Sequence, residues 1–330
     1  MDRDARIDSI KFFLIFCVAL GHCFGEFWDK PYVLPTYNFI YLFHMPLFIF
    51  LSGYFTKKRS LHSRDFWISE LKLLETFIVF NFIHKIPTFF TEPIELQDLI
   101  VPSWSLWYLL SLICWRFLIQ IMASTFKNCK VLITVAFLLG ALIGFSTLSG
   151  ALSIQRTFCF FPFFVVGYCV AQNNFIEKIR SVNHIFAIAI CAVTVIACFV
   201  FLNFDIHHVI WGLHPYEEFD VAVGYAFSLR LAFYVVALSL CFSIINLFSF
   251  KSPFMAKEGR NTLVYYMYHT LLLFLFFDLA ERFDIPVNIG VLVLITLLIM
   301  AIIFAMCRIK VFLWLLNPVS SILARHKKNG

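Results

Sequence analysis

Hydrophobic residues occur along the chain in long blocks that short polar stretches separate. A helix needs about 20 mostly apolar residues to cross a bilayer, and the blocks are of about that length. They predict an all-α polytopic membrane protein with about ten transmembrane helices, over residues 7–27, 38–56, 71–90, 103–123, 130–150, 157–173, 185–204, 222–249, 262–280 and 287–316. The last helix could end near Cys307, with the remainder lying in the interface. We expect one integral membrane domain over residues 1–330 and no soluble domain.

The basic residues of the polar stretches predict the orientation of these helices. With the N-terminus in the cytoplasm, 20 of the 26 Lys and Arg residues fall in inner segments, four in outer segments and two within helices. Lys and Arg accumulate on the cytoplasmic side of membrane proteins. A miscounted helix would invert every later loop and remove the asymmetry. Ten helices with both termini in the cytoplasm are therefore expected.

Composition adds limits on function. The chain has 61% hydrophobic and 14% charged residues, whereas soluble domains carry about a quarter charged residues. Almost all of the ten cysteines lie inside apolar blocks without paired spacing, so they indicate neither a disulfide framework nor a metal site. The net charge of +6 is explained by the inner loops. No nucleic-acid partner is expected.

The first apolar block, DSIKFFLIFCVALGH (8–22), contains both a lysine and a histidine. The eleven steps from Lys11 to His22 make about three helical turns and a rise of about 16 Å, which puts both side chains on one face. Lys11 can snorkel to the cytoplasmic interface, which explains it without a functional role. His22 lies in the outer half, where ionisable residues usually face the protein interior or a water-filled path. We interpret His22 as a functional residue.

The second apolar block carries another histidine at a similar depth. His44 lies in FIYLFHMPLFIFLSGYF (39–55) and could form one site with His22, or could only bond a carbonyl near the kink expected at Pro46. The inner loop that follows is rich in basic residues, Lys57, Lys58 and Arg59. They either mark the cytoplasmic side or bind the phosphates of an anionic ligand.

Five segments, taken in order, resemble the acyltransferase 3 family of integral membrane acyltransferases, and most closely the branch related to fucose 4-O-acetylases. The segments are DSIK with its Lys11-to-His22 spacing, FHMPLFIFLSGYF (43–55), WSLWYLLSL (104–112), RTFCFFPFFVVGY (156–168) and GRNTLVYYMYH (259–269). Most of the family has arginine where Lys11 stands, and lysine is typical of the branch. The extracytoplasmic hydrolase-like domain that some members carry has no counterpart here, so a second transfer step would need another protein.

The resemblance implies an O-acyltransferase that moves an acyl group, usually acetyl, from cytoplasmic acetyl-CoA to a sugar hydroxyl of an envelope or surface glycan. Lys11 and residues 57–59 would meet the CoA phosphates, and the pantetheine arm would extend along the first helix. His22 would act as general base or as a covalent acyl relay, two variants that the sequence does not separate. Expected partners are acyl-CoA, a glycan or lipid-linked sugar, and membrane lipid, at the bacterial cytoplasmic membrane. No permanently bound cofactor is expected.

The other family-like segments supply further candidates, each with a structural alternative. Trp104 and Trp107 could bind substrate or belong to the interfacial aromatic belt. Arg156 could stabilise developing negative charge on the acyl oxygen or anchor its helix. His269, expected in the inner half of its helix, could flank a CoA channel or form an interhelical hydrogen bond. Arg260 and Asn261 could contact phosphate or begin a helix.

The longest outer loop, FDIHHVIWGLHPYEEFD (204–220), has room for structure of its own. Trp211 and Tyr216 in this loop could stack on a sugar ring. Its three histidines and two glutamates are irregularly spaced in a loop expected to be exposed, so no metal site is predicted.

A transporter or exporter of an envelope polysaccharide is the alternative function, because ten helices would also suit it. Transporters commonly contain a repeat of helices in their two halves, and the sequence has no evident repeat. The acceptor sugar, the hydroxyl position, the choice between acetyl and another small acyl group, and the oligomeric state are left open by the sequence.

Overall fold

The structure is a computed structural model that describes residues 4–89, 101–147, 153–200, 206–248 and 251–321. All regular secondary structure in these ranges is helical. The elements are α1 (Ala5–Gly25), α2 (Leu34–Phe55), α3 (Arg64–Phe89), α5 (Trp107–Thr125), α6 (Cys129–Leu142), η1 (Ile143–Phe145), α7 (Ile154–Gln172), α8 (Ile176–Ser181), α9 (His184–Val200), α10 (His207–Trp211), η3 (Tyr216–Glu218), α11 (Val223–Leu247), α12 (Pro253–Glu258), α13 (Thr262–Arg282), α14 (Ile289–Met306) and α15 (Lys310–Leu316).

The structure confirms an all-helical polytopic arrangement. Within the described ranges, seven helices are long and apolar enough to cross a membrane: α1, α2, α5, α7, α11, α13 and α14. The other three predicted spans correspond to α3, which falls outside that apolar set, and to the shorter apolar helices at Cys129–Phe145 and His184–Val200. The count of ten and the orientation stay predictions. The predicted helix ends at residues 90, 148–150, 201–204 and 249 lie outside the described residues.

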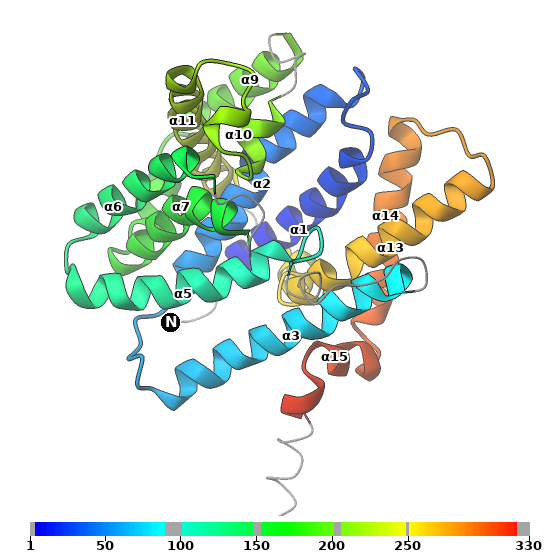
Figure 1. The fold of residues 1–330 in the computed structure, drawn as a ribbon, viewed down its shortest axis with the longest axis horizontal. Helices are drawn as coiled ribbons and strands as arrows, with labels where there is room; N and C mark the ends of the chain where they lie inside the picture. The colour runs from blue at the N-terminus through cyan, green and yellow to red at the C-terminus, as the bar shows by residue number, and fades with distance from the viewer. Residues whose placement is uncertain (1–3, 90–100, 148–152, 201–205, 249–250, 322–330) are drawn as a thin grey trace, which may run out of the picture.

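The helices α1 and α2 occupy the centre of the bundle, and α7 packs along α2 (Figure 1). Small residues permit this close approach. A Cβ at Gly53 would overlap the backbone carbonyl of Phe164, and a Cβ at Gly167 would overlap that of Phe50. The two glycines therefore set how near α2 and α7 lie.

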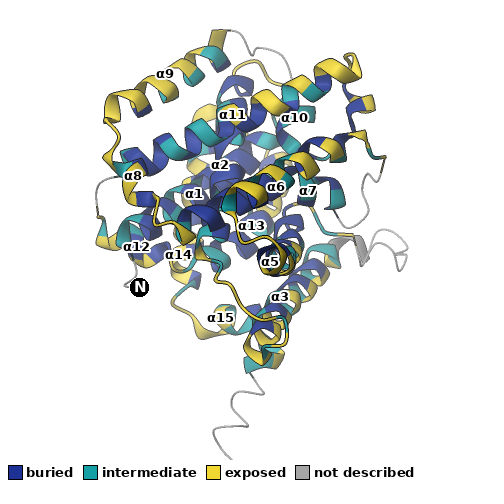
Figure 2. Cartoon of the chain, turned by 90° about the vertical axis from the view of Figure 1, so that its left-hand side faces the viewer, coloured by how far each residue is buried: buried dark blue, intermediate teal, exposed yellow. Residues whose placement is uncertain are grey.

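Exposed residues lie along the peripheral helices, most clearly on α9 (Figure 2), and many of the exposed residues are large and apolar. On α9, the side chains of Ile185, Phe186 and Val193 are each more than 60% exposed. In a soluble protein such a surface would be costly, whereas lipid tails provide an apolar environment for it. The exposed apolar belt is what a bilayer would cover.

The short helix α12 ties the start of α13 to α1 and to the end of α14. The Gly259 backbone packs against the carbonyl of Asp8, where a Cβ would not fit. Glu258 is fully buried, and its carboxylate accepts hydrogen bonds from Arg308, at 2.5 and 2.9 Å, and from Tyr265, at 3.0 Å. Burial raises the pKa of Glu258, but these donors outweigh it and hold the pKa below its usual value. This junction fixes how far α13 is displaced along α1.

Candidate active site

A cavity of about 330 Å³ opens between α1, α2, α7 and the segment that contains α10. It collects six of the candidate residues from five separate parts of the chain. They are His22, His44, Trp104, Trp107, Arg156 and Trp211. The cavity therefore unites the histidines of the first two helices with an arginine and three tryptophans.

His22 is held by a second histidine from α13. The Nε2 atom of His269 lies 3.1 Å from Nδ1 of His22, and Nδ1 of His269 lies 2.8 Å from the carbonyl oxygen of Tyr266. A carbonyl only accepts, so Nδ1 of His269 carries a proton and its Nε2 is an acceptor when the ring is neutral. Neutral His22 then donates from Nδ1. The nitrogen of His22 left to act on a substrate is Nε2, with its lone pair.

The contact with His22 is an interhelical hydrogen bond, the second of the two roles that the sequence left open for His269. Its side chain lines neither this cavity nor the two cavities on the predicted cytoplasmic side. His269 lies in the first half of α13, which begins at Thr262. His269 is thus placed to orient His22.

His44 has both a structural bond and a face on the cavity. Its Nδ1 lies 2.8 Å from the carbonyl oxygen of Ile40, one helical turn earlier. Its Nε2 is buried and has no hydrogen-bond partner in the described part of the chain. Since Nδ1 donates to the carbonyl, Nε2 of neutral His44 is an acceptor. The bond to a carbonyl and a place in one site with His22 are therefore both realised.

Arg156 brings a positive charge to the same cavity. Its guanidinium carbon lies 5.2 Å from the centre of the Trp107 ring, a cation–π geometry. None of the described residues bonds to its Nε, which is buried. The ring of Trp104 lies 4.7 Å from that of His22. A partly buried guanidinium whose Nε–H has no partner among the described residues suits an oxygen that gains negative charge.

Two further cavities lie on the predicted cytoplasmic side of this site and adjoin each other. One, of about 250 Å³, is lined by Lys57, Arg59 and Arg116 among others. The other, of about 230 Å³, is lined by Lys11, Tyr108 and Tyr266 among others. They share Ser52 and Leu112. The ring of Tyr266 also lies 5.8 Å from that of His269, so it separates the second cavity from the histidine pair.

Lys11 lies on α1 as expected, and its charge is neutralised within the helix. Its Nζ is 2.9 Å from Oδ1 of Asp8, a carboxylate that is almost fully buried, and 5.4 Å from the centre of the Phe55 ring. The lysine thus does more than snorkel, because it also lines the second cavity. We call the cavity lined by His22 and Arg156 the outer cavity, and the two cavities lined by Lys57 and by Lys11 the inner cavities. Along one face of α1, Lys11 therefore borders an inner cavity and His22 borders the outer cavity.

The structure does not bring every candidate to these cavities. Lys58 donates its Nζ to the carbonyl of Ala123 at 3.0 Å, and Arg260 is largely exposed, with its Nε 3.9 Å from Asp8. Neither these two nor Asn261, which precedes α13, lines the three cavities. Tyr216 is not placed to stack on a sugar ring, as the sequence had suggested, because it is fully buried and its hydroxyl donates to the carbonyl of Ala141.

Comparison with known proteins agrees with the motifs. The family model described as "Acyltransferase domain", acyltransferase 3, matches residues 4–308.

The chain belongs to the acyltransferase 3 family. Among curated proteins it is similar to the nodulation protein NolL of Sinorhizobium fredii (strain NBRC 101917 / NGR234), with 26% identity over 239 residues. That match covers 65% of this chain and 59% of the length of NolL. No solved structure matches the chain significantly.

Several residues that line the cavities of this acyltransferase 3 chain escaped the sequence analysis. Tyr37 and Tyr41 share a face of α2 with His44, at spacings of four and three residues, and line the outer cavity with Glu26. That helical spacing was a usable signal. Arg116, in contrast, is paired with Glu70 of α3, at 2.9 Å between Nη2 and Oε1. No sequence rule links two residues on different helices in this way.

Proposed function

We propose that the protein is a membrane-embedded O-acyltransferase that moves an acyl group, with acetyl as the expected group, from cytoplasmic acyl-CoA to a sugar hydroxyl of an envelope or surface glycan. The observation that carries the proposal is the position of His22. It borders the outer cavity while His269 engages its Nδ1, and its own helix continues to Lys11 at the inner cavities. A base with one nitrogen oriented and the other available is the arrangement that general-base catalysis requires.

The inner cavities suit the nucleotide end of the donor. Lys57 and Arg59 supply two positive charges around one hollow, and Arg116, which is paired with Glu70, also lines it. Guanidinium groups bind phosphate with paired hydrogen bonds. The loop carrying the first two is fixed, because Gln120 accepts from the backbone N–H of Arg59 at 2.6 Å and donates to the carbonyl of Lys57 at 3.2 Å. The slender pantetheine arm would continue past Lys11 and Tyr266 towards His22.

The outer cavity suits the acceptor sugar. Its walls combine aromatic rings with polar groups that are able to bond hydroxyls, and the Nε1 of Trp211 donates to the hydroxyl of Tyr37 at 2.5 Å. Trp104 stands beside His22. Glu26, directly after the end of α1, adds a carboxyl group to the lining of this cavity. A sugar here would lie within reach of the base.

The proposed reaction combines a proton transfer through His22 with the transfer of the acyl group to the sugar oxygen. Nε2 of His22 takes the proton of the sugar hydroxyl as its oxygen bonds to the thioester carbonyl carbon, and Arg156 stabilises the negative charge on the carbonyl oxygen. The tetrahedral intermediate expels the CoA thiolate, which receives the proton from His22. In the relay variant, Nε2 of His22 attacks the thioester carbonyl carbon and the C–S bond breaks to release the CoA thiolate. The sugar oxygen then bonds to the acyl carbon and displaces Nε2, which takes up the hydroxyl proton and passes it to the thiolate.

A gene deletion tests the function against the exporter alternative. The surface glycan of the deletion strain is purified and treated with mild alkali, and the released acyl groups are measured. The proposal expects normal glycan export with loss of ester-linked acetate. Loss of export itself would instead support a transporter. Restoration by the wild-type gene, but not by a His22→Ala gene, assigns the effect to this protein.

A further inference from the structure

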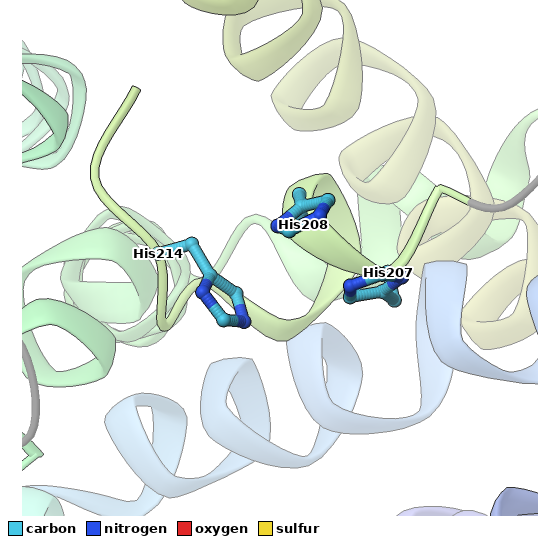
Figure 3. Close-up of side chains that lie close together, drawn as sticks. All are labelled: His207, His208 and His214. Atoms are coloured by element: carbon cyan, nitrogen blue, oxygen red, sulfur yellow. The ribbon is translucent and has the colours of Figure 1, made fainter. Parts of the chain in front are cut away.

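Three histidines of the outer segment lie close together although they line none of the cavities described above. His207 and His208 belong to α10, and His214 follows in the next turn (Figure 3). One ligand nitrogen from each lies within 4.8 Å of the others, and all three residues are partly buried. The expectation of an exposed, irregular loop is thereby corrected, because most of residues 206–219 are at least partly buried.

A single left-handed residue brings the third histidine back to the first two. Gly212 ends α10 with φ +62°, a conformation that glycine adopts without steric cost. A Cβ at this position would also lie 2.8 Å from Sγ of Cys159 and 2.9 Å from the ring of Phe160. Gly212 thus reverses the chain against α7, which turns irregular sequence spacing into spatial proximity.

The carboxylate of Glu218 orients one of these rings for a metal. Oε2 of Glu218 lies 2.6 Å from Nδ1 of His214, so Nδ1–H donates to the carboxylate and Nε2 presents its lone pair. This Nε2 is buried and, among the residues the structure describes, has no hydrogen-bond partner. Metal-binding histidines usually donate their second nitrogen to a carboxylate in this way. An uncompensated buried acceptor indicates that a ligand belongs there.

We propose that His207, His208 and His214 bind one divalent transition metal ion, with Zn²⁺ as the ion that fits best. Neutral imidazoles are preferred ligands of Zn²⁺, whereas Mg²⁺ and Ca²⁺ prefer oxygen. Zn–N bonds of about 2.0–2.1 Å place tetrahedral ligand nitrogens about 3.3 Å apart. The ligand nitrogens lie within 4.8 Å of one another, so binding would draw them together by up to about 1.5 Å, and a water molecule would complete the fourth position.

The ion acts on the fold of the outer segment rather than on the acyl group. The ring of His207 lies 4.7 Å from that of Trp211 and 5.2 Å from that of Trp28. Trp211 in turn lines the outer cavity and bonds Tyr37. Binding of Zn²⁺ would therefore fix the segment that closes one wall of the cavity. This inference concerns metal binding itself and stands whether or not the cavity accepts a sugar.

The test uses the full chain, purified in detergent without a histidine tag and stripped with a chelator. Zn²⁺ is titrated by calorimetry, bound metal is measured by elemental analysis after gel filtration, and X-ray absorption reports the ligands. We expect one Zn²⁺ per chain, three nitrogen ligands of imidazole type and a rise in Tm on binding. Less than a tenth of an equivalent of zinc bound to folded protein would overturn the proposal.

Variants separate this site from adventitious zinc binding. His208→Gln should abolish stoichiometric binding, and Glu218→Gln should weaken it by about 10–100-fold through loss of the carboxylate that orients His214. The exposed His62, on the loop before α3, gives the matched control His62→Gln, which should bind as the wild type does. Each variant is first checked by gel filtration and circular dichroism. Equal affinity in His208→Gln and in the wild type would contradict the assignment.

Discussion

Nε2 of His269 lies 3.1 Å from Nδ1 of His22, which joins α13 to α1 beside the outer cavity. Two carbonyls near Nδ1 of His269, at 2.8 and 3.2 Å, fix the direction of this hydrogen bond. A base that is held in one tautomer is always in the form that can accept a proton from the substrate. The hydrogen bond explains why a second buried histidine lies beside His22: His269 fixes the tautomer of the base.

The first prediction concerns this pair. His269→Ala removes the acceptor for His22, and we expect kcat to fall about 10- to 100-fold, less than loss of the base itself, which is worth about 10²- to 10⁴-fold. KM for acetyl-CoA should stay unchanged, because His269 lines neither inner cavity. Rates are measured with labelled acetyl-CoA and glycan from the deletion strain.

A conservative variant separates orientation from packing. His269→Gln keeps an oxygen that can accept from His22 and should retain more activity than His269→Ala. If both variants lost the same activity, and Tm fell equally in both, the contact would be a packing contact only.

The second prediction concerns Arg156. Arg156→Ala should lower kcat by about 10²- to 10³-fold, the loss expected when one donor to an oxyanion is removed. Arg156→Lys keeps the charge and should recover part of the rate. Arg282→Ala, at an exposed ion pair with Asp278 at the end of α13, is the matched control and should have no effect. Wild-type rates in Arg156→Ala would exclude a role in stabilising the transition state.

The third prediction concerns the inner cavity. Lys57→Ala or Arg59→Ala should raise KM for acetyl-CoA several-fold, with little change in kcat, because each removes a charge from a phosphate-binding hollow. Lys58→Ala is the neighbouring control, since Lys58 bonds the Ala123 carbonyl outside the cavities. The effect should shrink in high salt. An equal change of KM in all three variants would indicate general loop charge rather than a site.

The fourth prediction concerns the buried junction of α12 with α14. Glu258→Gln removes a carboxylate that is bonded to Arg308 and Tyr265, and should cost about 1–3 kcal/mol, seen as a lower Tm at pH 7. Because the pKa of Glu258 is held below its usual value, its contribution is present above the unfolded pKa of about 4.3 and is lost as pH falls. The difference in Tm between variant and wild type should therefore stay constant down to about pH 4.3 and narrow as the pH falls below that value.

The exposed Glu281, near the end of α13, provides the control for this measurement. Glu281→Gln should leave Tm unchanged over the same pH range. A Tm difference for Glu258→Gln that stayed constant as the pH fell well below about 4.3 would contradict the ionised pair.

The sequence predicts the relative positions of residues on one helix, but few of the contacts between two helices. Lys11 and His22 lie on the single helix α1, so their spacing was enough to place one at an inner and the other at an outer cavity. That His269 meets His22 depends on how α13 packs against α1. Arithmetic on a single helix contains no information on such packing.

The roles of the loop residues were predicted least well, because reversals of the backbone determine which of their side chains meet. The three outer histidines look irregular until Gly212 turns the chain back on α10. In the same segment, Trp211 lines the cavity and Tyr216 is fully buried against Ala141, although both are aromatic residues of one loop. Residue type alone does not distinguish these two environments.

The central claim is that His22 performs the acyl transfer, and proteoliposomes test it most directly. Wild-type and His22→Ala proteins, matched for amount and for Tm, are supplied with labelled acetyl-CoA and with glycan from the deletion strain. The account predicts that the initial rate of ester formation falls by about 10²-fold or more in His22→Ala. Transfer by His22→Ala at the wild-type rate would contradict both the general-base and the acyl-relay mechanism.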